Sequence, residues 1–273
     1  MDVRRWWTEL VGLVLPVACA GCGLEDDPWC ATCRALLGPA RRCEQRAGRL
    51  DLMGAPGALP VWCLADAVGP VRAAVVAWKD RGRFDLTRAF EAALADAARS
   101  LVGPLGPGPV LVVAAPSTPA SRRRRGGNLV DALAAAVARG LDHAGCRAEA
   151  VPVLARRGGD QVGLGTRARW LNLDGHVRVR RRAAASVQGR RVVLVDDVLT
   201  TGATLAACRT ALEATGAVVV GALTLASTPP PGAVAEKVRR TDCGSGAGVV
   251  AGAVAGLAWE SEPTAPRRRP REG

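Results

Sequence analysis

The sequence predicts an α/β protein with a mostly parallel, doubly wound sheet and a small cysteine-rich module at its N-terminus. Short apolar segments alternate with segments of helical periodicity through the middle of the chain. Two C-x-x-C pairs precede these segments, and a stretch rich in Pro, Gly and Arg follows them. We therefore expect a helix and zinc ribbon over residues 1–45, a linker over 46–60, the α/β domain over 61–228 and a disordered tail over 229–273.

The first residues are predicted to form a short amphipathic helix. Apolar residues recur at helical spacing over residues 2–14, and Pro16 ends the pattern. Glu9 interrupts the apolar stretch and no small-x-small cleavage site follows, so we expect no signal peptide. No run reaches the roughly 18 apolar residues that a membrane span needs. These observations favour a soluble, cytoplasmic protein.

The elements of the α/β domain follow from its apolar pattern. Strands are expected at 61–68, 110–115, 150–154, 191–195 and 218–225. Helices are expected at 70–79, 85–101, 128–141 and 203–215. The Arg- and Gly-rich segment 156–182 fits neither pattern and is predicted to be irregular. Buried strands separated by helices favour parallel pairing, because a parallel connection needs a long crossover.

The charge of the chain favours anionic partners. Of its 273 residues, 37 are basic and 25 acidic, which gives a net charge of +12. Lys79 and Lys237 are the only lysines, so the remaining 35 basic residues are arginines. Aromatic residues make up 3% of the chain, which argues against a sheet that binds nucleobases by stacking. We interpret the arginine clusters, such as Arg122 to Arg125, as solvated surface, with a contact to diphosphate as the alternative.

Four of the nine cysteines have the spacing of a metal site. Cys19 and Cys22 form one C-x-x-C pair, and Cys30 and Cys33 form a second one seven residues later. Four sulfur ligands without a nearby histidine favour a closed, structural Zn²⁺ site over a catalytic one. Thiol redox chemistry and unmetallated thiols are the alternatives. The other cysteines are interpreted as packing residues: Cys43, Cys63, Cys146, Cys208 and Cys243.

A polar segment follows the predicted strand at 191–195. It begins with Asp196 and Asp197 and continues as Thr200-Thr201-Gly202-Ala203-Thr204 into a predicted helix. Carboxylates at the end of a strand can accept hydrogen bonds from a vicinal diol, and backbone N–H groups at a helix N-terminus can bind a phosphate. The segment therefore predicts a ribose 5-phosphate site. A P-loop is excluded because the acids precede the glycine and no lysine follows it.

This segment resembles the phosphoribosyl diphosphate (PRPP) signature of type I phosphoribosyltransferases. Other pieces narrow the resemblance: the cysteine pairs, Trp78-Lys79-Asp-Arg-Gly82, Pro116 with Arg125-Gly-Gly-Asn128, and Gln161-Val-Gly-Leu164 with Arg169 and Asn172. Together they are similar to the ComF family over residues 5–227. That family joins a zinc ribbon to a type I phosphoribosyltransferase-like domain and is associated with natural competence and DNA uptake.

The resemblance implies a role for each matching position. Asp196 and Asp197 would bind the ribose hydroxyls and form the catalytic pair. PRPP would also contact Thr200, Thr201, Gly202, Ala203 and Thr204. The diphosphate-loop candidates are Pro116, Ser117, Thr118, Lys79 and Arg125. The candidates for the hood that binds the acceptor are Gln161, Arg169 and Asn172. The implied cofactors are Mg²⁺, bound with PRPP, and structural Zn²⁺.

The chain departs from the family pattern at three points. The usual Arg-Gly-Phe-Asn reads Arg-Gly-Gly-Asn, the acidic residue before Arg169 is Ala168, and a second cysteine ribbon is reduced to Cys43 and Cys63. The leading interpretation is a phosphoribosyltransferase that binds PRPP and Mg²⁺ and modifies a nucleobase-like acceptor. The alternative is a non-catalytic sensor of PRPP or a nucleotide that binds single-stranded DNA alongside competence proteins.

Overall fold

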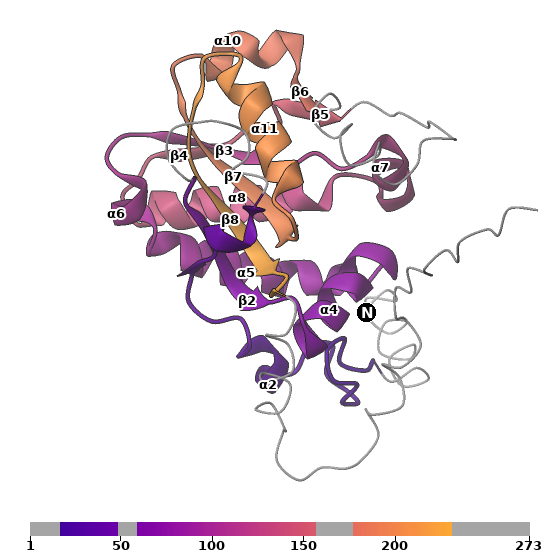
Figure 1. Ribbon diagram of the computed structural model, residues 1–273. Coiled ribbons are helices and arrows are strands. Elements are labelled where there is room, and N and C mark those ends of the chain that lie inside the picture. The colour runs from indigo at the N-terminus through magenta and orange to yellow at the C-terminus, as the bar shows by residue number, and fades with distance from the viewer. Residues whose placement is uncertain (1–16, 49–58, 157–176, 231–273) are drawn as a thin grey trace, which may run out of the picture. The chain divides into compact units, whose positions relative to one another are not determined.

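The computed structural model describes residues 17–48, 59–156 and 177–230 (Figure 1). Within these ranges, the main sheet has the strand order β1-β2-β8-β7-β3-β4. Neighbouring strands pair in parallel except β1, which is antiparallel to β2. The strands are β1 (Arg41–Arg42), β2 (Val61–Asp66), β3 (Val110–Ala114), β4 (Ala148–Ala150), β7 (Arg191–Leu199) and β8 (Val218–Ser227). The prediction of an α/β fold on a mostly parallel sheet is confirmed.

Helices cover both faces of this sheet (Figure 1). Alternate strand residues such as Val112 and Val193 pack toward α4 (Gly69–Asp80), α5 (Thr87–Arg99) and α8 (Leu129–His143). Their neighbours Leu111 and Leu194 pack toward α11 (Ala203–Glu213) on the other face. Side chains alternate along a strand, so a strand buried on both faces must be apolar throughout, as β3 is.

Shorter elements connect this framework. Four short helices are described: α2 (Ala31–Arg34), α6 (Val102–Leu105), α7 (Pro119–Arg125) and α10 (Ala184–Val187). Three 3₁₀ turns are also present: η1 (Glu44–Arg46), η2 (Phe84–Leu86) and η3 (Arg181–Ala183). In the described parts of the chain, no helix is long and apolar enough to cross a membrane.

Two of the sequence predictions are wrong in their secondary structure. The segment 150–154 is not one strand, because Pro152 lacks an N–H group and the chain divides there. The first part is β4, and the second is β5 (Leu154–Arg156), which pairs antiparallel with β6 (Val177–Val179) in a separate two-stranded sheet. Residues 177–179 were therefore wrongly predicted as irregular.

The acidic residues of the polar segment also lie differently from the prediction. β7 does not end at Val195, because its pairing with β8 continues to the contact between Leu199 and Ser227. Asp196 and Asp197 therefore lie inside the strand instead of after it.

Several predictions fall on residues outside the described ranges. These are the N-terminal helix over 2–14, most of the linker, the tail, Cys243 and the hood candidates Gln161, Arg169 and Asn172.

Candidate functional site

The topology of the sheet places two of the predicted loops side by side. β3 and β7 are neighbours, but the chain leaves β3 through α8 toward β4, and leaves β7 through α11 toward β8 on the opposite side. In open α/β sheets, ligands bind at the carboxyl ends of the strands where the connections diverge in this way. The loops at 116–118 and 200–204 both begin at this point, and Ala115 N donates to Val195 O at 2.8 Å.

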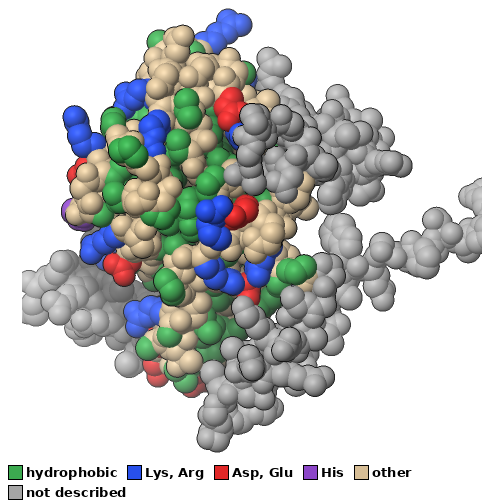
Figure 2. Space-filling model, turned by 60° about the vertical axis from the view of Figure 1, so that its left-hand side comes forward, with side chains coloured by type: hydrophobic (Ala, Val, Ile, Leu, Met, Phe, Trp, Pro, Cys, Tyr) green, Lys and Arg blue, Asp and Glu red, His purple; other side chains and the backbone are tan. Residues whose placement is uncertain are grey.

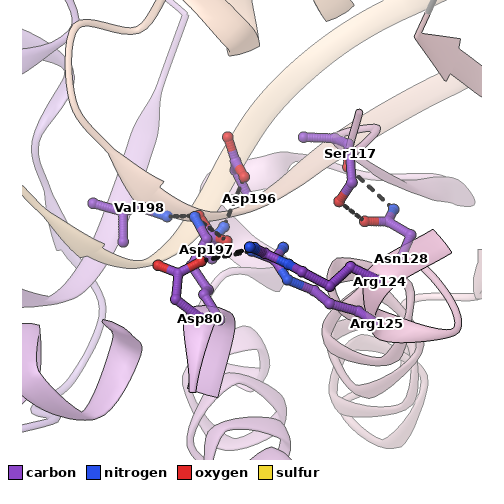
Figure 3. Close-up of polar contacts among 10 residues, drawn as sticks. Asp80, Ser117, Arg124, Arg125, Asn128, Asp196, Asp197 and Val198 are labelled. Carbon is purple, nitrogen blue, oxygen red and sulfur yellow. Dashed lines mark hydrogen bonds and ion pairs between the residues drawn. The ribbon is translucent and has the colours of Figure 1, made fainter. Parts of the chain in front are cut away.

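The acid pair, Asp196 and Asp197, flanks the strand at this edge (Figure 3). Because side chains alternate along β7, Asp197 faces α4, whereas Asp196 faces α11. Asp197 is buried, and its Oδ2 lies 2.8 Å from Lys79 Nζ at the end of α4. Asp197 N donates to Asp196 Oδ1 at 2.8 Å, and Val198 N donates to Asp197 Oδ1 at 2.7 Å. The two carboxylates are thus oriented by the backbone of their own strand.

The surroundings of Asp196 make it easier to protonate than an ordinary carboxyl group. Burial raises the pKa of Asp196 to about 7, and the nearby charge of Asp197 contributes to the increase. The N–H group of Asp197 and the positive charges of Lys79 and Arg156 oppose it. A carboxyl group with this pKa is roughly half ionised at pH 7, so a ligand that needs the anion must displace a proton.

This raised pKa gives a prediction for stability. A carboxyl whose pKa is higher in the folded protein stabilises the fold below its unfolded pKa near 4, and that contribution is lost as the pH rises through about 7. Asp196→Asn removes the titration, so we expect it to be more stable than the wild type at pH 8 by about 1–2 kcal/mol, allowing for partial solvent screening. Near pH 4.5 the two proteins should differ little. Urea denaturation at both pH values measures this, and a pH-independent difference would contradict the assignment.

The C-terminal end of α4 also forms ion pairs with α7. Asp80 Oδ1 accepts from Arg125 at 2.9 Å and from Arg124 at 3.2 Å. The Arg125 side chain is 10% exposed, and its buried Nε has no hydrogen-bond partner within the described residues. Lys79 and Asp80 are consecutive residues at the end of α4. Lys79 therefore connects this helix to Asp197 of β7, and Asp80 connects it to the arginines of α7.

The loop after β3 is fixed by Asn128 (Figure 3). Its Oδ1 accepts from Ser117 Oγ at 2.6 Å, and its Nδ2 donates to Ala115 O at 3.2 Å and to Asp131 Oδ1 at 2.8 Å. Thr118 Oγ1 accepts from Ser121 N at 3.2 Å and caps α7. Sequence reasoning missed Asn128 as a site residue, although its place after Arg-Gly-Gly was a signal. The structure brings Ser117 and Asn128 together, and it uses Thr118 as a helix cap.

The loop after β7 turns at Gly202. Its φ of +79° lies in the left-handed region that favours glycine, and a β-carbon there would lie 2.9 Å from Ala47 Cβ. α11 begins directly after it, and Thr201 Oγ1 accepts from Ala203 N at 3.4 Å. The first backbone N–H groups of a helix have no partner within the helix, so those that follow Ala203 can bind an anion. Thr200 is exposed and Thr204 partly exposed beside this turn.

The four predicted metal ligands form one cluster. The sulfurs of Cys19, Cys22, Cys30 and Cys33 all lie within 4.8 Å of one another. The sulfurs of Cys22 and Cys30 are 3.6 Å apart, close to the edge of about 3.8 Å that a tetrahedron with 2.3 Å Zn–S bonds requires. Burial opposes ionisation of Cys19, but the backbone N–H groups of Cys22, Cys30 and Gly21 lower its pKa to about 6. The donor set therefore fits Zn²⁺.

The cluster packs against the α/β domain. Trp29 meets Phe90 of α5 edge to face, with ring centroids 4.8 Å apart. Arg83 donates to the carbonyl oxygens of Ala18 and Pro28, each at 3.0 Å. At Gly21, a β-carbon would lie 2.8 Å from Cys33 Sγ, so the hairpin needs glycine to bring the sulfurs together.

We expect the purified protein to contain one Zn²⁺ per chain. Cys22→Ser removes one of four sulfur ligands, so the metal should be released and residues 17–48 should become sensitive to protease. Elemental analysis of protein purified without added metal, with limited proteolysis, provides the measurement. Absence of zinc, or zinc retained in a Cys19→Ser/Cys30→Ser variant, would contradict this prediction.

Comparison with known families finds a match for part of the α/β region. Residues 132–245 match the family described as "Phosphoribosyl transferase domain", and the match includes the acid pair and the Gly202 turn. This part of the chain is a phosphoribosyltransferase-like domain. No curated protein matches the chain.

Solved structures with some similarity to this phosphoribosyltransferase domain also exist. One is a hypoxanthine phosphoribosyltransferase from Staphylococcus aureus, 15% identical, with a TM-score of 0.31, over 51% of this chain and 64% of that one. Another is described as the allosteric regulatory enzyme of purine biosynthesis, 19% identical, with a TM-score of 0.30, over 52% of this chain and 26% of that one. The chain thus spans less than two thirds of either protein.

Proposed function

We propose that the phosphoribosyltransferase domain binds PRPP with Mg²⁺ and transfers its phosphoribosyl group to a nucleobase-like acceptor, in a protein of ComF type. One observation carries this proposal: the acid pair lies near the end of β7 and the Gly202 turn lies in the loop that follows it, where the connections after β3 and β7 diverge. A diol and a phosphate separated by a ribose ring match that combination of carboxylates and free N–H groups.

Each part of the site has a role in this proposal. Asp196 and Asp197 accept hydrogen bonds from the ribose hydroxyls, and Lys79 pairs with Asp197 and orients it. The hydroxyls of Thr200, Thr201 and Thr204 and the N–H groups at the start of α11 donate to the 5-phosphate. The loop at Ser117, with Arg125 nearby on α7, binds the diphosphate. Mg²⁺, bound with PRPP, supplies positive charge to the departing diphosphate.

The reaction needs no nucleophile from the protein. The bond from ribose C1 to the diphosphate oxygen breaks, the electron pair leaves with the diphosphate, and a lone pair of the acceptor nitrogen forms the new bond to C1. The ribose acquires oxocarbenium character between these events, and the acceptor nitrogen loses its proton. Catalysis then depends on orientation and on stabilising the charge of the leaving group.

Isotope exchange tests catalysis directly. Labelled diphosphate is incubated with PRPP, Mg²⁺ and each candidate nucleobase, and label appearing in PRPP shows reversible transfer. We expect exchange with at least one base, lost on removing Mg²⁺ and retained in His143→Gln, which changes an exposed residue at the end of α8. No exchange with any base, together with intact PRPP binding, would favour a non-catalytic sensor.

A second candidate function rests on an arginine-lined concavity. A hollow of about 550 Å³ is lined by Ala155 and five arginines: Arg122, Arg178, Arg180, Arg181 and Arg182. On the face shown in Figure 2, by contrast, Lys and Arg side chains lie scattered among apolar and acidic ones. Five arginines around one hollow favour a polyanion as ligand, so single-stranded DNA in a competence-type process is the alternative partner.

Binding of DNA would depend steeply on salt. Phosphate contacts release counterions, so affinity for an unstructured oligonucleotide should fall as salt rises, with little sequence preference. Arg180→Ala/Arg181→Ala/Arg182→Ala should weaken binding and flatten the salt dependence, whereas Arg72→Ala on the exposed side of α4 should not. Fluorescence anisotropy across a salt series measures both, and affinity that survives high salt would contradict a phosphate-based site.

A further inference from the structure

Two buried cysteines outside the metal cluster lie where the chain at β1 pairs with β2, at the edge of the main sheet. Antiparallel pairing places Arg41 of β1 opposite Cys63 of β2, and Cys43 N donates to Val61 O at 2.8 Å. Cys43 and Cys63, here called the thiol pair, are 1% and 0% exposed, pack in the same core cluster, and lie on the same face of the paired chain segments. Their burial is typical of packing residues, but the polar and charged side chains around them are not typical of an apolar core.

The thiol pair is part of a charged network. Cys63 Sγ lies 3.2 Å from Ser227 Oγ, which accepts from Arg46 Nη1 at 2.7 Å. Arg46 Nη1 also donates to Asp66 Oδ1 at 2.6 Å, and Arg41 pairs with the same carboxylate. Two guanidinium groups therefore lie at this carboxylate, close to the sulfur of Cys63, where positive charge favours a thiolate.

The ionisation of the two sulfurs differs accordingly. The neighbouring Cys43 side chain lowers the pKa of Cys63 to about 6, with Ser227 and the two arginines adding to the effect against burial. The neighbouring Cys63 side chain, together with burial, raises the pKa of Cys43. One sulfur is thus a nucleophile at neutral pH, and its neighbour is a thiol that can resolve an oxidised product.

Cys208 provides an internal comparison. It is equally buried, and burial raises its pKa. Within the described residues it hydrogen-bonds to no other sulfur. A thiol in this environment reacts slowly with peroxide, because the thiolate is the nucleophile.

We propose that Cys43 and Cys63 form an oxidation site, which hydrogen peroxide converts into a disulfide. The Cys63 thiolate attacks one peroxide oxygen, the O–O bond breaks, and hydroxide leaves, which gives a sulfenic acid. The Cys43 sulfur then attacks the Cys63 sulfur and loses its proton, and water leaves as the S–S bond forms. Two sulfurs are oxidised and one peroxide is reduced, so no other reductant or oxidant is needed.

The site can be tested on the full, zinc-loaded chain. Protein is treated with graded hydrogen peroxide, free thiols are alkylated, and trypsin digestion is followed by mass spectrometry. Cleavage after arginine yields the peptides Cys43–Arg46 and Leu50–Arg72, so the disulfide joins these two peptides and disappears on reduction. We expect this product to form at least about tenfold faster than Cys208 is oxidised, because the thiolate is the reactive form of cysteine.

Two variants separate the steps. Cys43→Ala removes the resolving thiol, so Cys63 should accumulate as a sulfenic acid that dimedone traps. Cys63→Ser removes the nucleophile, so Cys43 should remain reduced. If the variants do not fold, the wild-type peptide map still decides. Oxidation of Cys63 no faster than that of Cys208, or disulfides that only join other cysteines, would overturn the proposal.

Discussion

Asp196→Asn/Asp197→Asn is expected to abolish PRPP binding while leaving the fold in place. Hydrogen bonds to charged groups contribute about 1.5–3 kcal/mol each, so losing both carboxylate charges removes most of the binding free energy of the ribose. A ligand at about 100 times its dissociation constant stabilises a fold by about 2.7 kcal/mol, so PRPP with Mg²⁺ should visibly raise the melting temperature of the wild type. The variant should show no such increase.

The wild type and the double variant must be compared by the change in melting temperature that PRPP causes, and not by their absolute melting temperatures. Asp196→Asn alters intrinsic stability, because the carboxyl group has a raised pKa in the folded protein. His143→Gln serves as the control because it changes an exposed residue away from β7. An undiminished shift in the double variant would show that PRPP binds elsewhere. The single variants should also differ, since only Asp197→Asn leaves Lys79 without its partner.

The fold could be predicted from local patterns because its strands are buried on both faces. β3 is apolar at every position, and no other element type fits a run of that length between helices. The end of β7 could not be predicted in the same way. Asp196 and Asp197 have poor strand propensity, and only pairing with β8 as far as Ser227 keeps them extended.

The site could be predicted only where its residues are adjacent in the sequence. The segment from Asp196 to Thr204 is continuous, so its chemistry is visible without a structure. The ion pair of Lys79 with Asp197 joins positions 118 residues apart (197 − 79), and no local pattern encodes it. The thiol pair is a similar case, because Cys43 and Cys63 acquire their charged surroundings only when β1, β2 and the end of β8 meet.

Lys79→Met is expected to weaken PRPP binding by at least about tenfold at pH 7, and to shift binding to higher pH. The ammonium of Lys79 lies 2.8 Å from Asp197 Oδ2, whose side chain is 9% exposed, so its removal leaves a buried carboxylate without its cation. The charge of Lys79 also lowers the pKa of Asp196, so that pKa should rise above about 7 in the variant. More of Asp196 is then protonated at pH 7, and each pKa unit corresponds to about a tenfold change.

The pH dependence of PRPP binding in Lys79→Met distinguishes an effect of Lys79 on Asp196 and Asp197 from a direct contact between Lys79 and diphosphate. If Lys79 acts through the charge of Asp196, raising the pH toward 9 ionises Asp196 and restores much of the affinity in Lys79→Met. If Lys79 binds diphosphate itself, the loss is the same at every pH, because the missing charge cannot be replaced. Lys79→Arg keeps the cation and should bind nearly as the wild type does, and Arg72→Met controls for the loss of a positive charge on the same helix. Calorimetric titration with Mg²⁺ and PRPP at pH 6, 7, 8 and 9 gives both the affinity and its slope, and an unchanged profile in Lys79→Met would remove Lys79 from the site.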